Sequence, residues 1–397
     1  MLREADERAD EVTDSSGAQV LRAVLELGSA PRSALARHAR LSPATVTAHT
    51  RALLDAGLLV QLPETTVGGV GRPHVPLALD TRNVVLGLHI AVEQATVSVV
   101  DLAGTLIGTR RLPHGGGGPR QVLERAAAEI EHVRDGLPAE VRVLGLGMAT
   151  GGWVDADAGE VVEHRHLGWR NVAAREYLSV RTGLRTEVDN HTRALLHAEQ
   201  LFGRMRHSAS AIVLFVGNVI DVAFAVAGKV HYGPRAAAGS IRRLSGDGSD
   251  SASALFDDYS DAVLADRAVA DGIVSAPVLS ELLVRAEAAH SPANRLFVER
   301  AHGLGQVIAK LVDLLNPDTV IVADRSFELP GVSAAYRDAA QRYRAVPGTA
   351  DIITGSSFPG RVLAAAASAV SLHATYRAPL SAEPVYSIPT YFNSDEC

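Results

Sequence analysis

The segment from Ser42 to Arg51 carries side chains whose types suit contact with DNA. Small hydroxyl residues at the N-terminus of a helix can approach phosphates and base edges closely, and an arginine can reach a phosphate or a guanine. A glycine-rich stretch that ends in an arginine, Gly68–Arg72, can lie along the DNA backbone or enter the narrow minor groove. We therefore predict these DNA-binding residues: Ser42, Ala44, Thr45, Thr47, Ala48, Arg51, Gly69, Gly71 and Arg72.

Three helices and a hairpin would position these side chains. Apolar residues spaced by three and four predict the first helix, and Ser42 followed by Pro43 is typical of a helix N-terminus. The pattern predicts a winged helix-turn-helix over 15–80. Because its outer face is not strongly basic, a small helical subdomain that binds a partner protein is the alternative interpretation. The predicted helices cover 17–27, 32–39 and 43–57, and the predicted strands cover 58–62 and 74–79.

The rest of the chain predicts an α/β body over 81–378. Strand-like apolar runs alternate with helical patterns, which is typical of this class. Residues 1–14 form an acidic arm, and 379–397 form an irregular tail. The expected helices include 171–182, 191–203 and 360–375, and the expected strands include 185–188, 211–216, 221–227 and 319–323.

Composition excludes several classes of protein. The only cysteine among 397 residues is Cys397, so neither an internal disulfide nor a cysteine-based zinc site can form. No apolar run is long enough to span a membrane, and the acidic N-terminus lacks the apolar core of a signal peptide, so we expect a cytoplasmic protein. The net charge of −7 opposes general attraction to nucleic acid but allows one basic patch.

The chain resembles the ROK family (repressors, open reading frames and sugar kinases) along almost its whole length. The resemblance implies a winged helix followed by a two-lobed, actin-like sugar-kinase fold of the ribonuclease H-like class. It also implies a homodimer or homotetramer. The matching segments are GGVGRPHVPLALD, VVLGLHIAVEQATVSVVDLAG, LGLGMATGGWVDADAGEV, HLGWRNVAAREYLSVRTGLRTEVDNHTRALLHAEQLFG and LVDLLNPDTVIVA.

The departures from the family pattern predict that kinase chemistry is lost. Family kinases bind ATP phosphates with two glycine-rich turns, whose backbone N–H groups approach the phosphates. Here the turns read His89-Ile90-Ala91-Val92-Glu93 and Gly217-Asn218-Val219-Ile220-Asp221, with fewer glycines and two added carboxylates. His191 replaces the aspartate that serves as base in family kinases. We therefore expect no enzyme activity and no cofactor.

The family's zinc site is also missing from the sequence. Arg243 stands at the histidine position, and the family's cysteines are absent. The Asp- and Ser-rich segment that replaces them has no EF-hand spacing, so a solvated loop is expected there and no bound metal.

Two sugar contacts of the family are changed, which bears on the ligand. His191 replaces an aspartate and Ser240 a glutamate, while Asn190 and Gly152 are kept. Each lost charge-assisted hydrogen bond costs roughly 1.5–3 kcal/mol. We therefore expect a modified sugar, a glycosylated product or another metabolite rather than a plain sugar. For Trp153 and Trp169, core or interface packing is an equal alternative. The predicted effector-binding residues are Gly152, Trp153, His166, Trp169, Asn190, His191, Arg193 and Ser240.

These features predict a repressor whose binding to double-stranded operator DNA is controlled by a small effector. The effector would favour a lobe arrangement that spaces two winged helices wrongly for the operator half-sites. Two alternatives stay open: a sugar kinase with an added DNA-binding domain, and a DNA-binding protein whose body only mediates dimerisation.

Overall fold

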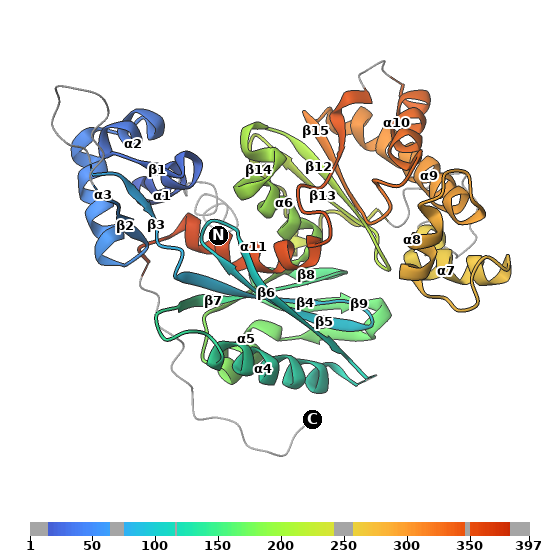
Figure 1. Ribbon diagram of the computed structural model, residues 1–397, viewed down its shortest axis with the longest axis horizontal. Coiled ribbons are helices and arrows are strands. Elements are labelled where there is room, and N and C mark those ends of the chain that lie inside the picture. The colour runs from blue at the N-terminus through green and yellow to red at the C-terminus, as the bar shows by residue number, and fades with distance from the viewer. Residues whose placement is uncertain (1–14, 64–74, 116, 242–256, 346–349, 382–397) are drawn as a thin grey trace, which may run out of the picture.

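The computed structural model describes residues 15–63, 75–115, 117–241, 257–345 and 350–381. Three parts surround the C-terminal helix: an N-terminal helical domain and two lobes, each built on a five-stranded sheet (Figure 1). The predicted arm at 1–14, the tip of the predicted hairpin and most of the predicted tail lie outside the described residues.

The N-terminal domain has the arrangement of a winged helix. Its helices are α1 (Ser16–Leu27), α2 (Arg32–Ala39) and α3 (Pro43–Asp55). Side-chain oxygens of Ser15 and Ser42 cap α1 and α3 by accepting backbone N–H groups, which is the chemistry predicted for Ser42. The strands are β1 (Ser29–Ala30), β2 (Leu59–Gln61) and β3 (Leu77–Leu79), and they form one antiparallel sheet in the order β1-β3-β2.

The first lobe is a mixed sheet in the order β11-β7-β4-β5-β6, with helices on both faces (Figure 1). Strand β4 has every residue buried, as expected for a strand covered on both sides. Helices α4 and α5 pack on one face and α11 on the other. The elements are β4 (Asn83–Ile90), β5 (Gln94–Asp101), β6 (Leu106–Pro113), α4 (Pro119–Asp135), β7 (Arg142–Thr150), α5 (Ala174–Thr182) and β11 (Thr186–Asn190).

A small antiparallel sheet extends the first lobe toward the second. It consists of β8 (Trp153–Asp155), β9 (Glu160–His164) and β10 (Trp169–Val172). The helix expected over 171–182 therefore starts only at Ala174. Its first residues instead belong to β10, because they pair with β9, and this pairing between segments could not be read from helical spacing.

The second lobe is a sheet in the order β14-β13-β12-β15-β16, flanked by helices. Long helix α9 and helix α10 pack together over a core centred on Phe297 and Tyr336. The elements are β12 (Ala211–Val216), β13 (Asp221–Val226), β14 (Lys229–Val230), α7 (Asp261–Ala270), α8 (Leu279–Ala286), α9 (Pro292–Leu315), β15 (Thr319–Asp324), α10 (Val332–Tyr343) and β16 (Ile353–Gly355).

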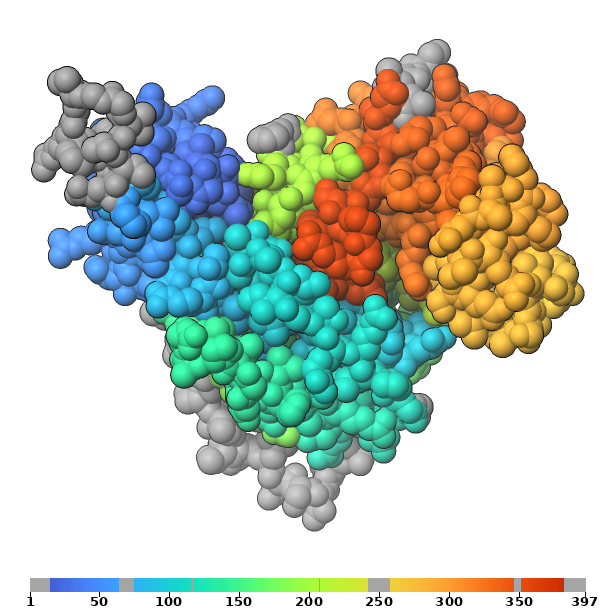
Figure 2. All heavy atoms as spheres, viewed as in Figure 1, coloured from blue at the N-terminus to red at the C-terminus, as the bar shows by residue number. Residues whose placement is uncertain are grey.

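Two helices connect the parts. Helix α6 (His191–Phe202) and the C-terminal helix α11 (Val362–Arg377) pack against each other, and α11 also contacts β4, β7 and α1. One apolar core joins Leu21 and Val24 of α1 to Leu372 and Tyr376 of α11. In the space-filling view, the red atoms near the start of α11 lie between the first lobe and the second lobe (Figure 2). The winged helix is therefore packed onto the body through α11.

Candidate functional site

The outward face of α3 presents most of the predicted DNA-binding residues. Ser42, Ala44, Thr47, Ala48 and Arg51 are exposed, and Thr45 is half-buried. We call the five exposed residues the DNA face. The opposite side of α3 is anchored by buried Val46, Thr50 and Leu53, which fixes the direction of the exposed side chains. Small side chains at the start of α3 leave its N-terminal N–H groups accessible to a phosphate.

Local hydrogen bonds use part of this face. Ser42 Oγ accepts the N–H of Thr45, and Thr47 Oγ1 donates to the carbonyl oxygen of Pro43. Arg51 Nε lies 3.9 Å from Asp55 Oδ2, and both side chains are highly exposed. An exposed pair of this kind contributes little, so the Arg51 guanidinium can turn to another anion at small cost.

Two further arginines precede α3 and were not among the predicted DNA-binding residues. Arg37 lies in the last turn of α2, and Arg40 directly follows that helix. The side chains of Arg37 and Arg40 are exposed, and neither side chain has a hydrogen bond or ion pair with any residue that the structure describes. Arg40 has φ +54°, a left-handed conformation that favours glycine. The tight spacing of α2 and α3 was the available signal, because such a turn commonly needs one left-handed residue.

The predicted wing is described only at its base. Strands β2 and β3 pair with Val60 opposite Ala78. The remaining predicted DNA contacts, Gly69, Gly71 and Arg72, lie outside the described residues.

A second polar cluster lies where β13 of the second lobe meets the first lobe. The Asp221 carboxylate accepts hydrogen bonds from Asn190 Nδ2 (3.1 Å) and the N–H of Gly152 (3.4 Å), and it lies 3.4 Å from His191 Nε2. Asn190 also donates to the carbonyl oxygen of Gly152 (2.8 Å). We call Gly152, Asn190, His191 and Asp221 the interlobe site. Three predicted effector-binding residues therefore lie together, with a carboxylate of this chain among them.

Two glycines allow this close approach. Gly152 has φ +79°, and an added Cβ would lie 2.4 Å from the carbonyl oxygen of Glu163. A Cβ on Gly151 would press against Val219 of the second former phosphate turn at 3.1–3.2 Å. A larger side chain at Gly151 would press against the second lobe, and one at Gly152 would clash with β9 within the first lobe.

Histidines surround the interlobe site. His89 Nε2 lies 3.4 Å from His191 Nδ1, and the His191 ring packs on Phe215 with centroids 4.0 Å apart. Burial, then the His191 charge, lowers the pKa of His89 well below its usual value. Burial, then His191, lowers the pKa of His164 to about 4. Hydrogen bonds and His191 hold the pKa of Asp221 below its usual value, although burial opposes this. The neighbourhood thus combines a carboxylate, Asp221, with two imidazoles, His89 and His164, and the pKa of each of the three groups is lowered.

Residues of the two turns that correspond to the family's phosphate turns make contacts within the chain. The first turn closes a hairpin in which Ala91 N–H donates to the carbonyl oxygen of Gln94, and Glu93 is exposed at its tip. In the second turn, Asn218 Oδ1 accepts the N–H of Ala262 at the start of α7, and Asp221 serves the interlobe site. Backbone and side chains that would face a nucleotide are therefore used in internal contacts.

Other predicted effector-binding residues have different surroundings. Trp153 donates from Nε1 to the carbonyl oxygen of Arg235 (2.9 Å), and the Arg235 guanidinium lies over its ring. Ser240 and His166 are exposed, and the rings of His166 and His164 meet edge to face with centroids 6.4 Å apart. Trp153 thus bridges the lobes, which is the interface interpretation of this residue.

Trp169 and Arg193 are structural in their placement. Trp169 is 1% exposed within the core of the first lobe. Arg193 is 2% exposed, pairs with Asp189 at 2.7 Å, and donates to the carbonyl oxygens of Ala236 and Val154. An effector contact of Arg193 stays a prediction, and it would require some of these internal contacts to be exchanged.

A hollow of about 450 Å³ opens beside the small sheet. It is lined by Glu163, His164, Arg165, Gly168, Trp169 and Arg170. His164 links this hollow to the interlobe site, because its pKa responds to both His191 and His166. Two buried nitrogens nearby, His89 Nδ1 and Trp169 Nε1, have no hydrogen-bond partner among the described residues. An unsatisfied buried donor costs about 1–3 kcal/mol, which a ligand with suitable polar atoms would recover.

Neither a metal centre nor a membrane span is found in the described part of the chain. No group of three or more His, Cys, Asp or Glu side chains there has the geometry to hold a metal ion. None of the helices in that part is long and apolar enough to cross a bilayer.

Comparisons with known proteins agree with this architecture. The ROK family model matches residues 85–244. A transcriptional regulator of Mycobacterium bovis is 31% identical over 392 residues, which cover 94% of this chain and 88% of the relative. The chain therefore belongs to the ROK family, in its branch of transcriptional regulators.

Solved structures share the fold. A ROK family transcriptional regulator that is a homologue of the E. coli MLC protein superposes with a TM-score of 0.71 and 21% identity, over 92% of this chain and 98% of that one. A ROK family glucokinase from Streptomyces griseus, in complex with glucose and AMPPNP, superposes with a TM-score of 0.64 and 20% identity, over 72% of this chain and 98% of that one. The two-lobed sugar-kinase fold expected from the sequence is confirmed.

Proposed function

We propose that this regulator is a repressor that binds operator DNA through its winged helix and releases it when a small effector binds between the lobes. The observation that carries the proposal is the DNA face: small side chains and Arg51 stand exposed on α3 while the opposite side of the helix is buried. Ser42, Ala44, Thr45, Thr47, Ala48 and Arg51 would approach the major groove. Gly69, Gly71 and Arg72 would reach the backbone or minor groove from the wing.

Arg37 and Arg40 extend this proposed surface. Both stand beside the start of α3 without an acidic partner in the described residues. Each would contact a phosphate on the flank of the site and add to the salt-dependent part of the affinity.

The effector is proposed to be a modified sugar, a glycosylated product or another polar metabolite. Gly152, Asn190 and His191 supply the polar edge of the site, and the hollow beside His164 and Trp169 supplies space of the usual size for a small ligand. His166 and Ser240 would contact the outer end of the ligand. A plain hexose is disfavoured, because Asp221 already accepts the Asn190 and Gly152 hydrogen bonds.

Loss of kinase activity is part of the proposal. An ATP phosphate would meet the Glu93 and Asp221 carboxylates, and the base position is His191, which contacts Asp221 and His89. The chain would use neither nucleotide nor metal. ATP-dependent phosphorylation of a hexose by the purified protein would instead favour the alternative of a kinase with an added DNA-binding domain.

Binding of a fluorescent duplex from the chain's own upstream DNA, read by anisotropy and gel shift, tests the main proposal. We expect retarded complexes of a homodimer or homotetramer, and we expect their affinity to fall steeply with salt. Failure to bind this duplex more tightly than a scrambled duplex of equal length would contradict the proposal.

One observation favours the second candidate, a DNA-binding protein without an effector. Asp221 accepts hydrogen bonds from Asn190 and Gly152 within the chain itself, while His191 Nε2, 3.4 Å away, has no hydrogen-bond partner among the described residues. A thermal-shift screen of sugars and glycosylated metabolites separates the two, because a ligand that binds only the folded state raises the melting temperature. A compound that both raises it and weakens DNA binding would support effector control.

A further inference from the structure

A line of polar contacts leads from the interlobe site toward the winged helix. Asp189 directly precedes Asn190, and its Oδ2 accepts the hydroxyl of Tyr232 (3.0 Å). The same Tyr232 hydroxyl lies 2.8 Å from His197 Nε2 on α6. The Tyr232 hydroxyl therefore joins Asp189, at the end of β11, to helix α6, which packs on α11.

The line continues across the contact of α6 with α11. The rings of His197 and His373 stack with centroids 3.7 Å apart and an interplanar angle of 21°. His373 lies on α11, which packs against α1 of the winged helix. Burial is the main cause that lowers the pKa of both histidines, and the charge of Arg22 on α1 lowers it further. The stack thus lies within the electrostatic reach of the DNA-binding domain.

This polar stack is unusual for its surroundings. Elsewhere, the same two helices meet through small apolar side chains such as Ala194, Ala198, Ala366 and Val370. His197 is 4% exposed, and burial is the main cause that lowers its pKa to about 4. Burying polar rings costs free energy that alanine or leucine would not. The stack of His197 on His373 is therefore better explained by a role in connecting α6 to α11 than by filling space between the two helices.

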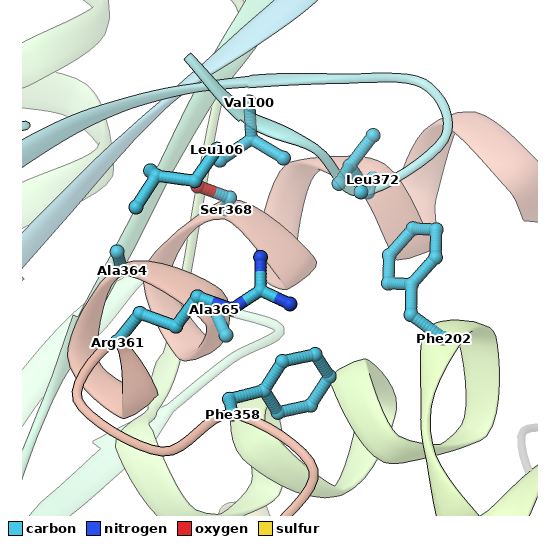
Figure 3. A pocket seen from close by; sticks show the side chains of 10 residues that line it. Val100, Leu106, Phe202, Phe358, Arg361, Ala364, Ala365, Ser368 and Leu372 are labelled. Carbon is cyan, nitrogen blue, oxygen red and sulfur yellow. The ribbon is translucent and has the colours of Figure 1, made fainter. Parts of the chain in front are cut away.

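A small hollow of about 10 Å³ lies beside α11, close to this stack. This hollow, at the N-terminal half of α11, is lined by Val100, Leu106, Phe202, Phe358 and Leu372, and the Arg361 guanidinium points into it (Figure 3). Leu372 directly precedes His373 and also belongs to the core shared with α1.

We propose that Tyr232, His197 and His373 are positioning residues that transmit the state of the interlobe site to α1 of the winged helix. This inference rests on the proposed function, because it deepens how that site controls DNA binding. A ligand that moves Asp189 or Asn190 would release the Tyr232 hydroxyl, turn the His197 ring out of the stack and change how α11 holds α1. The interlobe site and the winged helix would then both shift the equilibrium between two positions of α11.

Hydrogen exchange of the full chain, followed by mass spectrometry, tests the coupling without needing DNA or the effector. Tyr232→Phe removes only the bridging hydroxyl. We expect amides of α1 to exchange roughly threefold to tenfold faster, in line with one lost hydrogen bond. Tyr259→Phe, a matched loss of a hydroxyl in the second lobe away from this line, should leave α1 unchanged. Unchanged exchange in Tyr232→Phe, or an equal effect of Tyr259→Phe, would overturn the proposal.

A double-mutant cycle separates transmission from simple packing. His373→Ala should also speed exchange in α1, and the Tyr232→Phe/His373→Ala double variant should be no faster than His373→Ala alone. His373→Phe, which keeps a ring for the stack, should restore most of the protection. An exchange rate of α1 in the double variant that rises by the product of the two single increases would overturn the proposal. Exchange of β4 amides in every variant checks that the whole fold is intact.

The same experiments distinguish a failure of the proposed function from a failure of the proposed coupling. Wild-type protein that fails to bind its upstream duplex, while the cycle still shows coupling, would contradict the proposed function only. Specific DNA binding together with additive exchange effects would contradict only the coupling.

Discussion

The two polar regions of this protein differ in how far their side chains are exposed and paired with one another. On the DNA face, Arg51 is exposed, and the neighbouring Arg37 and Arg40 lack partners among the described residues. In the interlobe site, Asn190, His191 and the Gly152 N–H all meet the Asp221 carboxylate. Exposed cations without a side-chain partner suit a partner that arrives from solvent, whereas the contacts to Asp221 must be broken or rearranged before a ligand takes their place. We therefore expect the larger structural rearrangement on binding to occur between the lobes.

The largest expected effect comes from removing the internal acceptor. Asp221→Ala leaves the donors of Asn190 and Gly152 without their partner, so we expect a loss of about 2–3 kcal/mol in the free energy of unfolding. Urea denaturation measures it. Glu93→Ala, an exposed carboxylate at the other former phosphate turn, serves as the control and should change little. Equal stability of the two variants would mean that the interlobe network is not a structural contact.

The second effect is a loss of stability in acid. Burial holds the folded-state pKa of His164 at about 4, below the usual 6.5. The unfolded chain then binds more protons between these values, so this contribution is complete above pH 6.5 and is lost as the pH falls toward 4. The slope is at most about 1.4 kcal/mol per pH unit for one histidine. His164→Asn, which keeps an acceptor near the Leu167 N–H, should flatten the urea-measured profile; an unaltered profile would contradict this.

The third effect concerns only DNA binding. Arg51→Ala should weaken operator binding about tenfold and reduce the salt dependence by about one ion, because one cation near the groove is lost. Its only ion pair in the described residues is the exposed one with Asp55, so the free energy of unfolding should not change. Anisotropy titrations at several salt concentrations measure it. Unchanged affinity would count against docking through α3.

The smallest effect would show strain that is kept for binding. Arg40→Gly relieves a left-handed backbone at φ +54° and should stabilise the fold by about 1 kcal/mol. The same change removes a cation beside the DNA face and should weaken DNA binding. Arg40→Ala, which keeps the strain, is the matched control. Tighter or equal DNA binding by Arg40→Gly would make the arginine incidental.

The elements of the DNA face could be predicted from sequence because they depend on local rules. A serine cap, a proline at the first helical position and apolar spacing define the start of α3 and its buried side within a few residues. Arg40 was missed because its left-handed backbone arises from how two helices meet. The small sheet was missed for the same reason, since β8, β9 and β10 exist only through pairing with one another.

The interlobe site was predicted in part. Sequence comparison brought Gly152, Asn190 and His191 together, and it marked Asp221 as a change in a phosphate turn. It could not show that this carboxylate meets Asn190 across the lobes, that Arg193 is fully paired, or that His89 and Tyr232 belong to the same network. Those contacts join residues up to 102 positions apart in the chain.

The amino-acid sequence alone determined the order of the main helices and strands outside the small β8-β9-β10 sheet, the family, and the loss of the glycines that phosphate binding requires, because each of these depends on residue type and short-range spacing. Only the tertiary structure decided which charges are neutralised and which stay exposed. Neutralisation depends on distances between atoms from different segments, and packing of the whole chain sets those distances.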